Sequence, residues 1–284
     1  MSLVINTNFA SLTAQRSLTK NNEALTQSIQ RLSSGLRINS AKDDAAGLAI
    51  SEKLRAHVRS IGQAVRNSQD GMSLTQVAEG AMGEVSNILI RMRELAQQSS
   101  NGVLGDTERA KLDQEYQSLT SEINRIADIT EFNGTKLLNG TLSATGISLQ
   151  VGIQNASGNT VSVLSGLSGA ASLHSQSALG LTGASLTISV VASAAAALSM
   201  IDSAISNVAG KRGDIGASQN RLDITIANLR VASENFSAAE SRIRDADFAY
   251  ETAVFTKNQI LMQASMAVLA QANTLPQAAL QLLK

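Results

Sequence analysis

The sequence predicts a mainly α-helical protein: a long antiparallel helical bundle or coiled coil formed by its N- and C-terminal halves, with a small β-hairpin region and a short central insert. The first reason is the charge map, because residues 137–201 contain no Asp, Glu, Lys or Arg, whereas both flanks are charged. The second is the heptad-like spacing of apolar residues in both flanks, which is typical of helices that pack along a narrow seam. The third is that the chain has one proline, Pro276, which leaves long stretches free to be helical.

The composition excludes several classes of partner. The net charge of the 284 residues is zero, so no broad basic field exists to hold nucleic acid. Cysteine is absent, which excludes disulfides and thiolate metal sites. We see no window that approaches the ~18–20 apolar residues of a membrane-spanning helix, and the first residues lack the features of a cleaved signal peptide. We therefore expect no nucleic acid, membrane or cofactor as a partner.

An N-terminal helix is predicted from apolar residues spaced by seven, four, three and four positions. Ser33-Ser34-Gly35 weakens this helix, and we expect Asn39-Ser40 to break it. Ser40 with Asp43 then resembles a capping box for the next helix. The apolar seam consists of Leu18, Leu25, Ile29, Leu32 and Leu36.

A second helix is predicted over residues 42–98. At 1.5 Å per residue it would be a rod about 85 Å long, whereas an ordinary globular helix has about 11–12 residues. Several glycines interrupt it, and each costs about 1 kcal/mol relative to Ala in a helix interior. They either reflect neutral sequence drift in a helix that neighbouring helices stabilise, or provide bare backbone for the close approach of other helices. These glycines are Gly47, Gly62, Gly71, Gly80 and Gly83.

The middle of the chain is predicted to change from helix to strand. A third helix should begin at residues 106–108, where Asp, Thr and Glu are candidate caps, and Asn133-Gly134 and Asn139-Gly140 predict turns. Apolar residues then alternate with polar ones on both sides of a turn at residues 155–159, which indicates a β-hairpin with one apolar face. Residues 165–185 have low complexity and support no assignment. The alternating apolar residues are Ile147, Leu149, Val151, Ile153, Val161 and Val163.

Two further helices are predicted, one over residues 191–239 and one from about Arg242 to Asn273, where Leu275-Pro276 should stop it. Neither flank can bury its narrow apolar seam within a single helix. The simplest arrangement pairs the first helix with the last, and the long second helix with residues 191–239. The spare apolar surface invites more copies of the chain, and a repeated contact that does not close gives a helical filament. The seam of the last helix consists of Phe255, Met262, Met266 and Leu269, with Phe248 before it.

Several segments resemble the signatures of bacterial flagellin. Residues 31–47, Arg-Leu-Ser-Ser-Gly-Leu-Arg-Ile-Asn-Ser-Ala-Lys-Asp-Asp-Ala-Ala-Gly, are similar to the N-terminal signature. Residues 241–247, Ser-Arg-Ile-Arg-Asp-Ala-Asp, and residues 268–273, Val-Leu-Ala-Gln-Ala-Asn, are similar to the C-terminal one. The matching segments occur in order along both flanks, and the resemblance fails only in the middle, where flagellins vary most.

The resemblance implies a structural subunit that self-assembles into the helical flagellar filament used for motility. It places the terminal helices, residues 1–44 and 241–284, in an inner tube, and residues 45–140 and 188–240 in an outer-tube helical domain. Residues 141–187 would hold the β-hairpin and a short variable insert that faces solvent. Flagellins are secreted to the cell exterior, exported unfolded by the flagellar type III apparatus and polymerised at the distal tip. The implied partners are thus an export chaperone on the C-terminal helix, and cap and hook-junction proteins.

The resemblance also implies two kinds of surface site. Arg91, Leu95 and Glu115 match residues that the host Toll-like receptor for flagellin reads on the monomer. As ordinary helix residues, they would serve packing between subunits instead. Ser and Thr within residues 141–193 lie where many flagellins are O-glycosylated, and the alternative is a plain neutral surface.

No constellation of catalytic residues is visible, so we expect a structural protein and not an enzyme. The two histidines, His57 and His174, are far apart in the chain, and no P-loop, nucleophile elbow or metal-spaced cluster occurs. We expect His57 to be a partly buried helix residue. Two other functions stay open: a hook–filament junction protein of the same superfamily, and a secreted amphipathic translocator or adhesin. Acidic residues near the start of the last helix disfavour the anionic lipid that a translocator would meet.

Overall fold

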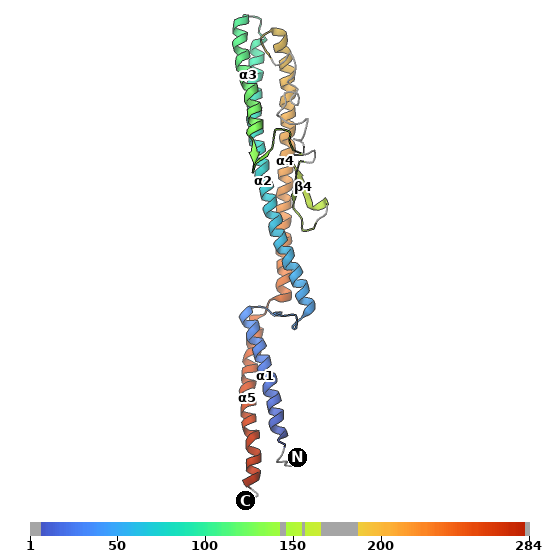
Figure 1. Ribbon diagram of the computed structural model, residues 1–284, viewed down its shortest axis with the longest axis vertical. Coiled ribbons are helices and arrows are strands. Elements are labelled where there is room, and N and C mark those ends of the chain that lie inside the picture. Colours follow the sequence, from blue (N-terminus) through green and yellow to red (C-terminus); the bar gives the residue numbers. More distant parts are fainter. Residues whose placement is uncertain (1–6, 143–145, 155–156, 166–186, 282–284) are drawn as a thin grey trace. The chain divides into compact units, whose positions relative to one another are not determined.

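The computed structural model describes residues 7–142, 146–154, 157–165 and 187–281, with the side chains of the last helix described as far as residue 274. The described chain is mainly α-helical, as the sequence predicted (Figure 1). It divides into two compact units, one of residues 1–58 with 234–284 and one of residues 59–233. Long helices α2 (Ala45–Ser99) and α4 (Val191–Arg244) contribute residues to both units.

In the first unit, α1 (Phe9–Ser34) lies antiparallel to α5 (Phe248–Gln281) (Figure 1). Near one end of the pair, Asn8 Nδ2 donates to the carbonyl of Ala272 at 2.8 Å. Near the other end, Arg31 Nη1 lies 3.6 Å from Glu251 Oε2. The predicted pairing of the first helix with the last is therefore confirmed.

Helix α1 ends earlier than predicted. Gly35 adopts a left-handed conformation with φ of 71° and donates its N–H to the carbonyl of Arg31 at 2.9 Å. Glycine takes this conformation without the steric cost that a Cβ would add, and it is therefore the usual residue just past a helix end. The prediction that Asn39-Ser40 breaks the helix was wrong, and Leu36 lies beyond α1 instead of on its seam.

The two chain segments that leave the α1–α5 pair are hydrogen-bonded to each other. The N–H of Arg37 donates to the carbonyl of Arg244 at 2.7 Å, and the N–H of Ala246 donates to the carbonyl of Gly35 at 2.9 Å. Leu36 and Asp245 thus form an antiparallel β-bridge. We call these segments, residues 35–44 and 245–247, the paired connectors.

The paired connectors explain where the neighbouring helices begin. Asp247 Oδ1 accepts from the N–H groups of Ala249 at 2.9 Å and Tyr250 at 3.2 Å, so α5 starts after Asp247 and not at Arg242 as predicted. Beyond that start, α5 continues through Pro276 to Gln281, so the prediction that Pro276 ends the helix was also wrong.

Helix α2 is capped by Asp44, whose Oδ1 accepts from the N–H of Gly47 at 2.8 Å, and not by Ser40 as predicted. The neighbouring Asp43 carboxylate accepts from the N–H of Ser40 at 2.9 Å and from Gln27 Nε2 of α1 at 3.1 Å. The backbone hydrogen bond from Ser40 contributes most to holding the pKa of Asp43 below its ordinary value. Asp43 therefore ties the first connector to α1.

In the second unit, α2 and α4 lie antiparallel, with α3 (Asp106–Ile129) packed beside them. Arg93 Nε of α2 donates to Asp202 Oδ1 of α4 at 2.6 Å, and Gln219 Nε2 of α4 donates to Glu79 Oε2 of α2 at 3.0 Å. The predicted pairing of the long second helix with residues 191–239 is confirmed in this unit. The shared core includes Met82, Val85, Leu89, Met92, Tyr116, Ile123, Ile201, Val208 and Leu222.

The start of α3 differs from the sequence-based expectation. Gly105 and not residues 106–108 is the N-cap of α3, while Asp106 and Glu108 lie in its first turn, where the helix dipole favours acidic side chains.

The composition of α4 also differs from our expectation. This helix contains a stretch that is long and apolar enough to cross a membrane by length and composition alone. Ala194, Ala197 and Ile201 of that stretch face the core, while 28% of the stretch is buried in all.

Both predicted turns and the hairpin lie in the second unit. Strands β1 (Glu131–Phe132) and β2 (Thr135–Lys136) are joined by Asn133 and Gly134, both with positive φ, as a type I′ turn requires. The predicted hairpin is confirmed by β3 (Ile147–Gln150), which pairs antiparallel with β4 (Thr160–Val163). The low-complexity stretch from residue 166 onward, with His174, lies outside the described residues.

The glycines of α2 have two different environments. A Cβ added at Gly71 would lie 2.1 Å from Leu149 Cδ1 of β3, so this glycine allows the hairpin to approach the helix. A Cβ added at Gly80 or Gly83 would meet no atom within 4 Å. Close approach therefore explains Gly71 within the chain itself, while Gly80 and Gly83 present bare backbone to open space.

Candidate functional site

The predicted apolar seams of α1 and α5 are divided between the contact of the two helices and the surface. Leu25 is buried, and Leu32, Phe255, Met262 and Leu269 are half-buried. Ile29 and Met266 are 48% and 47% exposed, respectively. Two helices alone therefore cover only part of the apolar surface that the pair presents.

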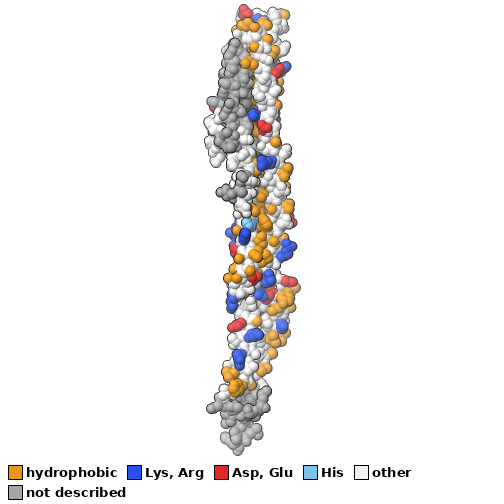
Figure 2. All heavy atoms as spheres, turned by 90° about the vertical axis from the view of Figure 1, so that its right-hand side faces the viewer, with side chains coloured by type: hydrophobic (Ala, Val, Ile, Leu, Met, Phe, Trp, Pro, Cys, Tyr) orange, Lys and Arg blue, Asp and Glu red, His pale blue; other side chains and the backbone are white. Residues whose placement is uncertain are grey.

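Further large apolar side chains are exposed on the same helix pair, and apolar atoms reach the surface where α1 and α5 lie (Figures 1 and 2). Single exposed apolar residues are normal on soluble proteins, whereas many on one element mark an interaction surface. We call this set the terminal apolar surface: Phe9, Leu12, Ile29, Phe248, Tyr250, Ile260, Leu261, Met266 and Val268.

Polar contacts also cross the α1–α5 interface, and the sequence analysis did not predict them. Asn21 Nδ2 of α1 donates to Ser265 Oγ of α5 at 2.8 Å, and Ser11 Oγ donates to Asn273 Oδ1 at 2.9 Å. A signal existed for Asn21, because it lies three residues after Leu18 and four before Leu25, where a heptad pattern expects an apolar residue.

The three residues matched to the receptor signature have different environments. Arg91 of α2 and Glu115 of α3 meet at the surface, with Arg91 Nη2 lying 2.9 Å from Glu115 Oε1. Hydrogen bonds to Glu94 and then Glu115 raise the pKa of the Arg91 guanidinium. Leu95 is only 1% exposed and belongs to the core. The structure thus brings Arg91 and Glu115 together and places Leu95 beneath the surface.

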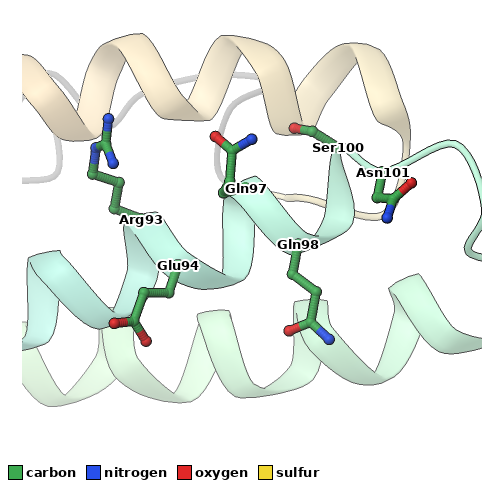
Figure 3. A pocket seen from close by; sticks show the side chains of 6 residues that line it. All are labelled: Arg93, Glu94, Gln97, Gln98, Ser100 and Asn101. Carbon is green, nitrogen blue, oxygen red and sulfur yellow. The ribbon is translucent and has the colours of Figure 1, made fainter.

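An open hollow of about 660 Å³ lies at the C-terminal end of α2. Figure 3 shows that Arg93 and Gln97 point toward α4, whereas Glu94 and Gln98 point toward α3. Beside it, the buried Arg109 donates from Nε to the carbonyl of Ser99 at 3.0 Å and from Nη2 to that of Asn101 at 2.9 Å. These bonds satisfy carbonyls that the end of α2 leaves free. The lining is polar, with Ser100 and Asn101 completing it.

The remaining predicted sites are only partly described. In the described part of residues 141–193, Ser148 and Ser162 of the hairpin are exposed, while residues 166–186 lie outside it. His57 is half-buried as expected, and its ring centroid lies 5.8 Å from that of Phe236. Among the described residues, no group of three or more His, Asp or Glu side chains could hold a metal ion.

Comparison with known proteins gives the same assignment at both ends of the chain. Residues 5–143 match the bacterial flagellin N-terminal helical region, and residues 198–283 match the bacterial flagellin C-terminal helical region. The chain is similar to the flagellin of Halalkalibacterium halodurans, with 48% identity over 99% of this chain and 100% of the relative. It is also similar to the flagellin of Bacillus subtilis, with 44% identity over 99% of this chain and 99% of the relative.

Among solved structures, the chain resembles a putative flagellar hook-associated protein from Vibrio parahaemolyticus, with a TM-score of 0.56 and 21% identity over 72% of this chain and 100% of that one. This likeness concerns the fold alone. The family matches and the two relatives carry the assignment: the chain belongs to the bacterial flagellin family, whose members are structural proteins, and it is a subunit of the flagellar filament outside the cell.

Proposed function

We propose that the chain polymerises by coupled folding and assembly of its terminal helices. The observation that carries this proposal is the terminal apolar surface, which the α1–α5 pair leaves exposed. Complete burial of a large apolar side chain contributes about 1.5–3 kcal/mol, while ordering one residue costs about 1–2 kcal/mol of backbone entropy. A two-helix contact with so many exposed apolar residues is therefore marginal. Docking onto neighbouring subunits buries the remaining surface and orders both helices.

In this proposal, residues 1–44 and 241–284 line the inner tube, and residues 45–140 and 188–240 form the outer tube. Residues 141–187 face solvent. Terminal helices that are weakly ordered before assembly suit export in an unfolded state. The apolar surface of α5 is what a cytoplasmic export chaperone would cover, and cap and hook-junction proteins would bind the ends of the filament.

The test is seeded growth observed by negative-stain electron microscopy. Heat-dissociated monomers are mixed with filament fragments, and long uniform filaments are expected to grow from the fragments. Persistent monomers or short caps would instead favour the hook–filament junction protein. Flotation of the monomer with lipid vesicles would favour the translocator and count against the polymer.

We also propose that the Arg91–Glu115 pair is read by the host Toll-like receptor on the monomer. Both side chains are exposed and joined, and Leu95 below them would hold α2 in place without touching the receptor. Arg91→Glu is expected to weaken binding of the receptor ectodomain by about tenfold or more, since it places like charges together. Arg125→Glu, at an exposed α3 position paired with Glu122, is the control. Equal binding by both variants would contradict the proposal.

O-glycosylation of Ser or Thr within residues 141–193 is proposed on the exposure of Ser148 and Ser162 and on the neutral composition of this stretch. Protein isolated from native filaments should then have an intact mass above the 29.7 kDa of the sequence. The excess should map to peptides from this stretch, and an unmodified mass would establish the plain neutral surface.

A further inference from the structure

The apolar contact between α1 and α5 is poorly suited to define one alignment of the two helices. Apolar side chains of α5 lie on its exposed side as well as on the side facing α1, because Ile260 and Val268 are exposed while Phe255 and Leu269 are half-buried. A helix that is apolar on several faces can meet a narrow seam in more than one rotation and register.

Polar contacts, in contrast, cross the interface at separate levels. At the N-terminal end of α1, Asn8 and Ser11 bond to the carbonyl of Ala272 and the side chain of Asn273. In the middle, Asn21 bonds to Ser265, and its Nδ2 also lies 3.4 Å from the carbonyl of Leu261. From one level to the next the partners lie further back along α5, from residues 272–273 to residues 261–265 and then to residue 251, so the levels agree with one antiparallel register.

The last level is an ion pair between a half-buried guanidinium and a buried carboxylate, and its hydrogen bonds are only partly satisfied. Glu251 is 4% exposed and pairs through Oε2 with Arg31. Its Oε1 and the Nε of Arg31 are buried and have no hydrogen-bond partner. Buried charges with unmet hydrogen bonds cost stability, so this pair adds little strength to the interface. In any other register, however, the Glu251 carboxylate would be buried without Arg31, and an unpaired buried charge costs more stability than this pair does.

We infer that Asn21 and the Arg31–Glu251 pair, acting together with the bridge between the paired connectors, determine the register of α1 against α5. A polar Asn in a coiled-coil seam is the best-attested device of this kind, because it sacrifices stability for one alignment, and the half-buried Asn21 stands at such a position. The register decides which side chains of the terminal apolar surface stand next to one another, and thus what the neighbouring subunit meets. The inference rests on the proposed function and adds the residues that make assembly specific.

The absence of cysteine makes the register measurable in the full chain. Spin labels are attached at Lys20→Cys of α1 and Gln263→Cys of α5, both exposed positions. Label distances are measured by pulsed electron resonance in seeded filaments diluted with unlabelled subunits. A slip of one heptad moves the labels along the helices by about 10 Å. For a variant that does not elongate seeds, the distance is measured in the monomer with trimethylamine N-oxide, which strengthens apolar burial.

Three variants separate register from strength. Asn21→Leu with Arg31→Leu and Glu251→Leu makes the interface apolar, and is expected to broaden the distance or shift it by about 10 Å. Arg31→Glu with Glu251→Arg keeps an ion pair and should retain the wild-type distance, although Arg31→Glu alone should lose it. The control, Glu122→Gln with Arg125→Gln, removes an exposed ion pair of α3 and should change nothing.

A wild-type distance in the all-leucine variant would overturn the inference, and so would a charge swap that behaves like Arg31→Glu alone. A failure of the proposed function has a different signature. The wild-type chain would then not elongate seeds at all, while the monomer distances would still report the register.

Discussion

Glycine in a helix has opposite consequences at two positions of α2, according to what lies beside it. Gly71→Ala is expected to destabilise the second unit by about 1–3 kcal/mol, because the new Cβ would overlap Leu149 Cδ1 of the hairpin. Gly80→Ala is expected to stabilise it by up to about 1 kcal/mol, since the methyl meets open space and helix propensity rises. Thermal unfolding of both monomeric variants by circular dichroism checks the two signs. Equal shifts of the unfolding temperature in the two variants would show that the hairpin does not pack closely against the backbone at Gly71.

Tyr116 links a single buried side chain to the pH dependence of stability. Burial, and next the charge of Asp113, raise the pKa of its phenol to about 12, from an ordinary value of about 10. The unfolded chain therefore ionises first as the pH rises. The stability that the neutral phenol contributes is complete below pH ~10 and is lost between pH ~10 and ~12, by up to about 3 kcal/mol. Urea unfolding at several pH values should show this loss.

Tyr116→Phe is the control for that measurement, because it keeps the ring and removes the ionisable group. Its stability should fall less than that of the wild type over the same pH range. If stability fell equally with pH in the two proteins, the phenol of Tyr116 would not contribute to the pH dependence. That result would contradict a raised pKa of Tyr116 in the folded chain.

At the scale of elements, the corner between α2 and α3 depends on one buried cation. Arg109 is 6% exposed and donates to two carbonyls at the end of α2. Arg109→Ala should cost about 2–4 kcal/mol, because those carbonyls lose a charged donor and a cavity forms. Arg125→Ala on the exposed side of α3 should cost much less, because solvent screens its ion pair with Glu122. Chemical denaturation of both variants makes the comparison, and similar losses would refute a special role for Arg109.

The sequence was sufficient for the elements and their pairing, and failed at their ends. Apolar period and turn dipeptides predicted the long helices, the hairpin and the Asn133-Gly134 turn. The end of α1 was misplaced because Gly35 adopts a left-handed conformation. This conformation ends the helix about four residues before the predicted break. The start of α5 was misplaced because the bridge between Asp245 and Leu36, which is remote in sequence, interrupts the helix before Asp247 caps α5.

The candidate sites show the same division. A heptad pattern identifies the residues of an apolar seam, but it does not show which of these residues the partner helix covers. Ile29 and Leu25 satisfy the same pattern, yet one is exposed and the other is buried. Leu95 likewise matches a surface signature and lies in the core, since its exposure depends on how α3 and α4 pack around α2.

At the scale of the whole molecule, folding of the middle and assembly of the ends should be separable. Deleting residues 1–35 or 250–284 removes one partner of the α1–α5 pair, while the core of the second unit lies entirely within residues 59–233. The truncated chains are expected to stay helical by circular dichroism but not to elongate seeds. Leu269→Asp, which places a charge in a half-buried seam, should also block growth without unfolding the middle. Filaments from either truncated chain would contradict coupled assembly.

The paired connectors have a mechanical consequence. A helix pair that hung from one strand could swivel about it, because rotation around single bonds in one linker is nearly free. Here two strands leave the pair together, and the bonds from Arg37 to Arg244 and from Ala246 to Gly35 tie them side by side. Twisting such a double strand strains both strands and both bonds at once, so it resists torsion. Torque applied to the α1–α5 pair is therefore expected to pass on to the adjoining ends of α2 and α4 and not to be lost as rotation of the pair about a single linker.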